Sequence, residues 1–140
     1  MAEIDDVLQG LLESTGASRV TLRQDVPGEV FPVTHEALGP GVGSLREERS
    51  VNMRTQPVAI EVAAGRQVVQ HDSATAYDDP DFHRMREIYG GLAAQIVTPV
   101  MVGGRVAAIV SLHQLGSPRT WTDDEIEECR AVAARIAGLV

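Results

Sequence analysis

Residues 94–140, AQIVTPVMVGGRVAAIVSLHQLGSPRTWTDDEIEECRAVAARIAGLV, decide the fold, because they contain a complete hairpin followed by a helix. Two largely apolar stretches, Ala94–Val102 and Arg105–Gln114, have the length and composition of strands. Gly103 and Gly104 separate them, and both can adopt the positive φ that a type I′ turn requires. This part of the chain therefore predicts an antiparallel β-hairpin.

A helix is predicted from the residues after Trp121 to the C-terminus. Thr122 and Glu125 have the Ser/Thr-x-x-Glu spacing of a capping box, in which each side chain satisfies a backbone N–H of the other residue. Trp121 and Ile126 stand where a hydrophobic staple has its two apolar residues. Beyond Ile126 the apolar residues recur at helical spacing, which indicates one buried face.

The rest of the chain alternates between helical and strand patterns. Apolar spacing, with Asp79-Pro80 as a helix start, predicts three helices and three strands before the hairpin. The helices are expected at Glu3–Ser14, at Gln56–Ala64 and from Asp79 to Gly90, the strands at Arg19–Arg23, Val30–Thr34 and Gln67–His71, and a mostly irregular segment at 38–54. We therefore predict a single α+β domain over residues 1–140, with a central antiparallel sheet of about five to six strands.

The two-residue turn also predicts which side chains of the hairpin share a face, because it places Val102 opposite Arg105 and Val100 opposite Ala107. The almost entirely apolar face, expected to pack against the terminal helices, carries Val97, Met101, Val106, Ala108, Val110 and Leu112. The other face mixes a few polar groups with apolar ones, as ligand pockets do, and carries Ala94, Ile96, Thr98, Val100, Ala107, Ile109, Ser111 and His113. Pro99 cannot donate a ladder hydrogen bond, so it predicts an edge or a bulge, and a bulge would exchange the faces beyond it.

Composition narrows the class of protein. The net charge is −8, and the twelve basic residues are scattered and are all arginine. This distribution argues against nucleic acid or an anionic membrane as a partner. No apolar run approaches the ~20 residues of a membrane-spanning helix, and the single cysteine, Cys129, cannot form an internal disulfide. We expect a cytoplasmic protein, and we read the exclusive use of arginine as GC-rich coding in a bacterium.

Several motifs in this order resemble a GAF domain, the small-molecule sensing module of bacterial signalling proteins and phytochromes. The residues that carry the resemblance are Ala17–Arg23, Gln56–Ala59, Gly65–Val69, Thr98–Val106 and Ser111–Arg119. The resemblance spans nearly the whole chain. It implies a sheet with the terminal helices on one side, and a ligand cavity on the other side under a lid around His71–Tyr89.

The resemblance and the face assignment together predict a site for a small organic ligand, whose identity and any cofactor stay open. The ligand-binding residues are expected on the lid (Tyr77, Phe82, Met85, Tyr89) and on the sheet (Ile96, Thr98, Ile109, Ser111, His113). In phytochrome-like members a similar histidine-to-Pro-Arg stretch belongs to the chromophore pocket, which makes His113 a candidate. Cys129 lies outside the usual attachment regions, so the resemblance does not imply a covalently bound bilin.

Three alternatives to a small-molecule sensor are a ligand-free module, an enzyme and a metal-binding protein. A structural or interaction module would fill the cavity with its own side chains. One branch of the family reduces free methionine sulfoxide, which needs an attacking and a resolving cysteine, whereas this chain has only Cys129. His71 and His83 lie near three aspartates in the sequence, but no metal-ligand spacing is present, and capping or turns explain the aspartates better.

Two protein partners are expected. The first and last helices both have apolar stripes, which predict a homodimer through these helices, and the other expected partner is a signalling protein.

Overall fold

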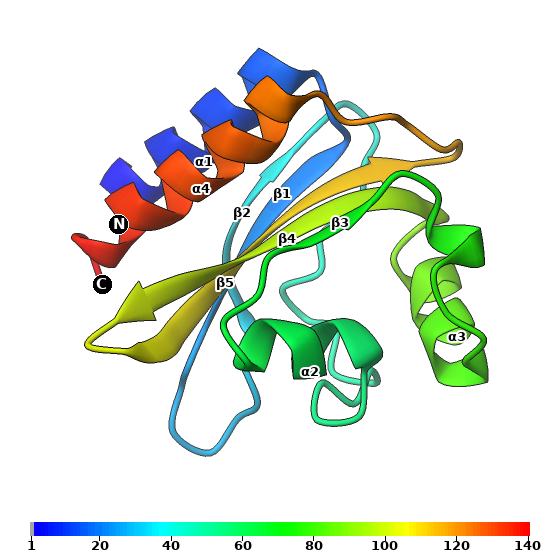
Figure 1. Ribbon diagram of the computed structural model, residues 1–140, viewed down its shortest axis with the longest axis horizontal. Coiled ribbons are helices and arrows are strands. Elements are labelled where there is room, and N and C mark those ends of the chain that lie inside the picture. Colours follow the sequence, from blue (N-terminus) through cyan, green and yellow to red (C-terminus); the bar gives the residue numbers. More distant parts are fainter. Residues whose placement is uncertain (1) are drawn as a thin grey trace.

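The computed structural model describes residues 2–140, which form one five-stranded antiparallel sheet with helices on both faces (Figure 1). The strand order is β2-β1-β5-β4-β3. This confirms the predicted fold class. In chain order the elements are α1 (Ala2–Thr15), β1 (Arg19–Gln24), β2 (Val33–Leu38), α2 (Pro57–Ala63), β3 (Val68–Gln70), the 3₁₀ turn η1 (Ser73–Thr75), α3 (Pro80–Ile88), β4 (Leu92–Val102), β5 (Arg105–Leu115) and α4 (Asp123–Ala137).

The terminal helices form one layer. In Figure 1, α1 and α4 lie side by side across one face of the sheet, while α2 and α3 lie on the other face. The apolar stripes of α1 and α4 are buried against the first face in a cluster that includes Leu8, Ile136 and Leu112. A second apolar cluster on the opposite face includes Val62 of α2, Phe82 of α3 and Val97 of β4. The sheet is therefore buried on both faces.

The local signals in the sequence fix the ends of the main elements. Gly103 and Gly104 have φ of 59° and 78°, as the type I′ turn requires. The Thr122 hydroxyl accepts from the N–H of Glu125, and the Glu125 carboxylate accepts from the N–H of Thr122, so the predicted capping box begins α4. The Asp79 carboxylate caps the start of α3, accepting from the backbone N–H groups of Asp81 and Phe82.

A β-bulge in the hairpin corrects the predicted register. Val102 pairs with Arg105 as expected, but Val100 pairs with Ala108, so the predicted pairing with Ala107 is wrong. Ala107 is the extra residue of the bulge, which lies beside Pro99. Because the side-chain period of a strand is two, one inserted residue exchanges the faces of β4 relative to β5.

The predicted faces of the side chains are therefore wrong for β4 and correct for most of β5. Ile109 faces the α2 and α3 side and the buried Ala108, Val110 and Leu112 face the terminal helices, as predicted. On β4 the prediction is wrong, since Val97 packs with α2 and α3, and the helix-facing residues are Ala94, Ile96, Thr98 and Val100. Val106, between the turn and the bulge, also packs on the α2 and α3 side instead of the predicted one.

Two other parts of the chain differ from or extend the prediction. The second strand runs over Val33–Leu38 and not Val30–Thr34, because residues 26–32 form a longer turn than expected. Val68, the first residue of β3, pairs with Val97, so Pro99 lies beyond the end of β3, where β4 has a free edge. Within residues 2–140, no helix is both long enough and apolar enough to cross a membrane.

The connection between β5 and α4 is attached to the end of β3. The backbone N–H of Trp121 donates to His71 Nδ1, and its indole N–H donates to the carbonyl of Gln70, both at 3.0 Å. The N–H of Arg119 donates to the carbonyl of His71. These bonds fix the start of α4 to the strand that leads into η1 and α3.

Candidate functional site: a cationic cavity between the sheet and two short helices

The floor of the site follows from the register of three neighbouring strands. His113 of β5 lies between Arg19 of β1 and Gln95 of β4. Two residues along, Ser111 lies between Thr21 and Val97, and the next row has Ile109 between Arg23 and Pro99. One end of this floor is therefore rich in polar side chains, although nearly all of it is buried.

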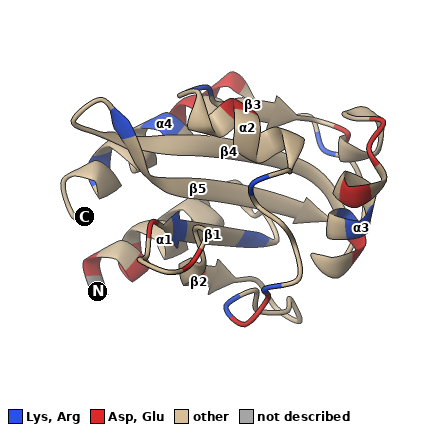
Figure 2. Ribbon diagram, turned by 90° about the horizontal axis from the view of Figure 1, so that it is seen from below, with Lys and Arg blue, Asp and Glu red and all other residues tan. Residues whose placement is uncertain are grey.

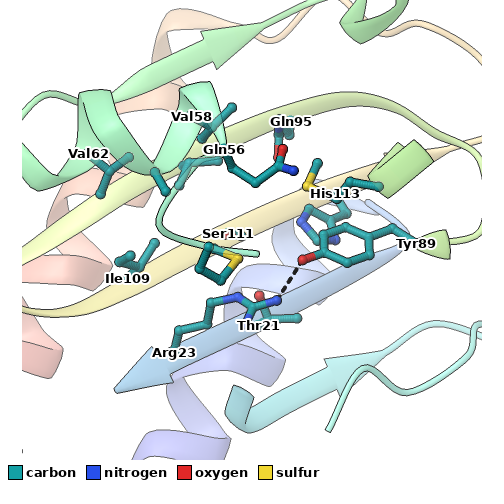
Figure 3. A pocket seen from close by; sticks show the side chains of 14 residues that line it. Thr21, Arg23, Gln56, Val58, Val62, Tyr89, Gln95, Ile109, Ser111 and His113 are labelled. Carbon is teal, nitrogen blue, oxygen red and sulfur yellow. Dashed lines mark hydrogen bonds between the residues drawn. The ribbon is translucent and has the colours of Figure 1, made fainter. Parts of the chain in front are cut away.

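The roof comes from two short helices and the segment before α2. Met53, Gln56, Val58, Ala59 and Val62 cover the floor from one side, and Met85 and Tyr89 cover it from the α3 side. Together with Thr21, Arg23, Gln95, Val97, Ile109, Ser111 and His113 they enclose what we call the α2–α3 cavity (Figure 3). Its volume is about 30 Å³, which leaves room for only one or two water molecules.

Two arginines of β1 supply the charge of the site. The Arg23 guanidinium donates to the carbonyl of Phe31 at 2.9 Å and to the Tyr89 hydroxyl at 2.7 Å, the bond drawn in Figure 3. Arg19, which is 1% exposed, lies behind His113 and donates to the carbonyls of Gly43 and Tyr89. Burial, with a smaller contribution from the charge of Arg23, lowers the pKa of Arg19 to about 10, while Tyr89 and Glu36 oppose the change. Arg19 therefore remains a cation at neutral pH.

His113 is neutral and oriented. Its Nδ1 accepts a hydrogen bond of 3.0 Å from Arg19 Nε, so the ring proton must be on Nε2. Burial, and then the positive charges of Arg19 and Arg23, hold the pKa of His113 well below its usual value. The ring stacks on Tyr89, with 5.7 Å between centroids. Its Nε2–H is thus a donor at the polar end of the cavity.

Gln56 lies in the roof with its amide unsatisfied. The residue is 1% exposed, and within the described chain neither its Nε2 nor its Oε1 has a hydrogen-bond partner. Most buried polar groups in native proteins have a partner, so such an amide calls for an explanation. Figure 3 shows it near Gln95, whose own amide donates to Gln70 at 3.0 Å.

The structure brings five of the nine predicted site residues together. Met85, Tyr89, Ile109, Ser111 and His113 line the α2–α3 cavity. Phe82 packs in the same apolar cluster without lining it. Tyr77 borders a separate hollow beside β3, where its hydroxyl donates to Glu61 and burial, with that carboxylate, raises the pKa of Tyr77 to about 12.

The remaining two, Ile96 and Thr98, are on the opposite face, so their assignment to the cavity is wrong. The bulge at Ala107 is the cause. Thr98 instead accepts a hydrogen bond from Gln67 in a groove beside α4.

Sequence reasoning missed four polar lining residues, Thr21, Arg23, Gln56 and Gln95. The alternation Arg19-Val20-Thr21-Leu22-Arg23 was a usable signal, because β1 pairs on both edges and both its faces are buried. A polar face on an inner strand then has to line a polar interior. No sequence pattern predicted that Gln95 lines the cavity, because the face of β4 on which it lies depends on the bulge.

The residues considered as a metal cluster have other roles. His71 accepts from Trp121, the His83 ring contacts the Tyr77 carbonyl, and Asp72 and Asp79 cap η1 and α3. Across residues 2–140 no group of three or more histidine, cysteine or acidic side chains is placed to hold a metal ion.

This chain belongs to the GAF domain family, whose sequence profile it matches over residues 2–140. No curated protein sequence is significantly similar to it. Solved structures with the same fold include the GAF domain of the cyanobacteriochrome TePixJ (TM-score 0.84, 18% identity, covering 99% of this chain and 86% of that one).

Two further structures are similar. GAF3 of Slr1393 from Synechocystis sp. PCC6803 has a TM-score of 0.79 at 17% identity and covers 97% of this chain and 89% of that one. The phycocyanobilin-bound GAF domain of a cyanobacterial phytochrome has a TM-score of 0.76 at 18% identity, covering 96% and 82%. At these identities the likeness establishes the fold alone.

A covalently attached bilin does not fit this chain. The only cysteine, Cys129, is 1% exposed and lies in α4, on the face of the sheet opposite the cavity.

Proposed function

We propose that this protein is a cytoplasmic, non-catalytic GAF-type sensor that binds a small organic molecule in the α2–α3 cavity. Tyr89, Ser111 and His113 would contact the polar part of the ligand, and Met85 and Ile109 its apolar part. Binding would order the segment from His71 to Gly91, which supplies part of the roof.

The observation that carries this proposal is the unsatisfied amide of Gln56. A buried polar group without a partner costs roughly 1–3 kcal/mol of folding free energy. Gln56 lines the cavity and is almost fully buried, so a molecule inside could satisfy both its N–H and its carbonyl. A protein that had no use for this group could replace it by an apolar residue of similar size.

One observation favours a second candidate, a structural or interaction module without ligand. The cavity of about 30 Å³ is far smaller than the roughly 300–1,000 Å³ typical of ligand pockets. A sensor would therefore have to move α2, α3 or the segment 39–56 outward when it binds, whereas a ligand-free module would keep this packed interior.

A thermal-shift screen separates the two candidates. Ligands that bind only the folded state raise Tm by mass action. We expect at least one compound from a panel of small aromatics, metabolites and haem to stabilise the wild type. Ala59→Phe, which puts a ring into the cavity, should abolish the shift, and Ala63→Phe, on the exposed side of the same helix, should retain it. No shift with any compound would favour the ligand-free module.

The non-catalytic part of the proposal is supported by the state of Cys129. Burial raises the pKa of its thiol to about 12, with Glu128 and Glu125 adding to the effect. A thiol of this kind is neither ionised nor accessible, so it is a poor nucleophile. Turnover of free methionine sulfoxide that survives Cys129→Ser would contradict this reasoning.

The output of the sensor would be read by a partner protein or by a second copy through α1 and α4. The apolar stripes of both helices are already buried within the protomer. A dimer would therefore use their outer surfaces, which include Glu3, Asp6 and Glu13 of α1 and Ala131 and Ala134 of α4. Light scattering at low and high salt tests this, because screening should strengthen contact between acidic surfaces.

A further inference from the structure

We propose that the α2–α3 cavity is built for a small organic carboxylate, whose negative charge would pair with Arg23 while its hydrocarbon part packs between α2 and the sheet. This inference rests on the proposed function and specifies the chemical class of the ligand.

The first argument is the charge of the cavity. Arg23 is the only charged residue among those that line it, and Arg19 lies directly behind His113. No ion pair within residues 2–140 includes either arginine. Acidic residues are absent from β1, β3, β4 and β5, and Figure 2 shows basic segments on β1. A net positive interior in a protein of net charge −8 favours an anionic guest.

The acidic groups around the two arginines are engaged elsewhere. Glu29 and Glu48 border a separate hollow with Arg23, where Glu29 pairs with Arg49 and Glu48 accepts from the backbone N–H and the hydroxyl of Ser50. Glu36, whose charge raises the pKa of Arg19, contacts Arg46 at 3.5 Å and accepts from the N–H of Leu45 at 3.1 Å. Glu61 of α2 accepts from the Tyr77 hydroxyl, outside the cavity. A buried charge without a counter-ion is costly, and a carboxylate supplied by a ligand would offset that cost.

The second argument is the supply of donors. A guanidinium has five N–H groups, and the bonds of Arg23 to Phe31 and Tyr89 engage two of its nitrogens, once each. N–H groups therefore remain free on the same guanidinium, and its planar fork suits the two oxygens of a carboxylate. The His113 Nε2–H and the Gln56 amide offer further donors nearby.

The third argument concerns the rest of the ligand. Opposite the polar end, the walls are formed by the side chains of Val58, Val62, Val97 and Ile109. A phosphate or other inorganic anion would leave these apolar walls without contacts. With α2, α3 or the segment 39–56 moved outward to make room, a short branched or aromatic hydrocarbon carrying one carboxylate would use both parts of the cavity.

Matched pairs of probes test the inference. Isovalerate and benzoate carry the charge, isovaleramide and benzamide have the same shape without it, and sodium chloride and inorganic phosphate serve as anions without a hydrocarbon part. At a concentration of about 100 times Kd, we expect a carboxylate to raise Tm by about 5 °C or more. The amides and the inorganic anions should give no comparable shift at equal ionic strength.

Two substitutions link the effect to Arg23. Arg23→Gln removes the charge and should weaken carboxylate binding about 30-fold or more in ligand-observed NMR, which reads affinity independently of Tm. Arg66→Gln makes the same charge change at an exposed residue and should leave affinity unchanged. If Arg23→Gln fails to fold, Arg23→Lys keeps the charge without the planar fork and should still bind about tenfold more weakly.

The outcomes separate the two proposals. Binding of the amides as tightly as the carboxylates would overturn the inference and leave the sensor proposal standing. Equal stabilisation by phosphate or chloride would overturn the organic part. No binding of either probe series would overturn the inference, and the broader screen with Ala59→Phe would then decide whether the cavity binds anything.

Discussion

His113 is a buried histidine that accepts a hydrogen bond from a cation. Arg19 donates to its Nδ1, and burial, Arg19 and Arg23 all favour the neutral ring. The unfolded chain has no such constraint, and a histidine there takes up a proton near pH 6.5. Folding is therefore linked to the release of a proton from this side chain.

The sign of the pH effect follows from that linkage. Since the pKa of His113 is lowered on folding, its contribution to stability is present above about pH 6.5 and is lost as the pH falls below that value. We expect the free energy of unfolding to fall by up to about 1.4 kcal/mol per pH unit from this group. Urea denaturation at several pH values measures it.

His113→Gln should flatten this part of the profile, because glutamine can still accept from Arg19 but does not titrate. A profile with the same slope in wild type and His113→Gln would show that another group is responsible.

At the scale of the elements, the boundaries predicted from local side-chain chemistry were more accurate than the faces predicted from strand register. The boundaries of α3, α4 and the hairpin turn follow from Asp79, Thr122 and Gly103-Gly104, each of which acts on its own neighbours. The face of β4 depends on one inserted residue in its partner strand, which Pro99 indicated only as a possibility of a bulge or an edge. Thr21, Arg23 and Gln56 meet through long-range pairing, so no local pattern could place them in one cavity.

The capping box gives a direct test at this scale. Thr122→Ala removes the hydroxyl that accepts from Glu125 N–H and should cost about 1 kcal/mol of stability. Thr120→Ala, at an exposed residue just before the cap, should change stability by less than about 0.5 kcal/mol. Chemical denaturation of both variants measures the difference, and equal values would mean that the cap contributes nothing.

The bulge gives a second test. Deleting Ala107 would restore a regular hairpin register and turn the buried side chains of one strand to the wrong face. We expect the deletion variant to lose cooperative thermal unfolding, whereas Ala107→Ser, which keeps the chain length, should retain it. A deletion variant with near wild-type Tm would show that the bulge is dispensable.

At the scale of the whole molecule, the sheet separates two different interiors. The side under α1 and α4 is apolar and tightly packed, and the side under α2 and α3 contains the arginines, the histidine and the cavity. Covering both faces makes the strands inaccessible unless a helical layer separates from the sheet.

Cys129 reports on that separation, because it is the chain's single thiol and lies in α4 with its side chain buried in the apolar cluster against the sheet. A thiol reagent should modify the native protein only as fast as the α1–α4 layer opens, and the rate should rise with denaturant. In a Cys129→Ala background, Ala134→Cys on the exposed side of α4 should react at once. Rapid labelling of native wild type would contradict the packing of this layer.

The hydrogen bonds at the end of β3 have a consequence for how the two interiors communicate. Gln95, in the cavity floor, donates to the side-chain carbonyl of Gln70. The backbone carbonyl of Gln70 accepts from the indole of Trp121, just before α4. A change in the cavity under α2 is thus connected to the opposite helical layer by a short chain of hydrogen bonds around the edge of the sheet. Since Trp121 is the chain's single tryptophan, its emission provides a native optical signal for whatever enters the cavity.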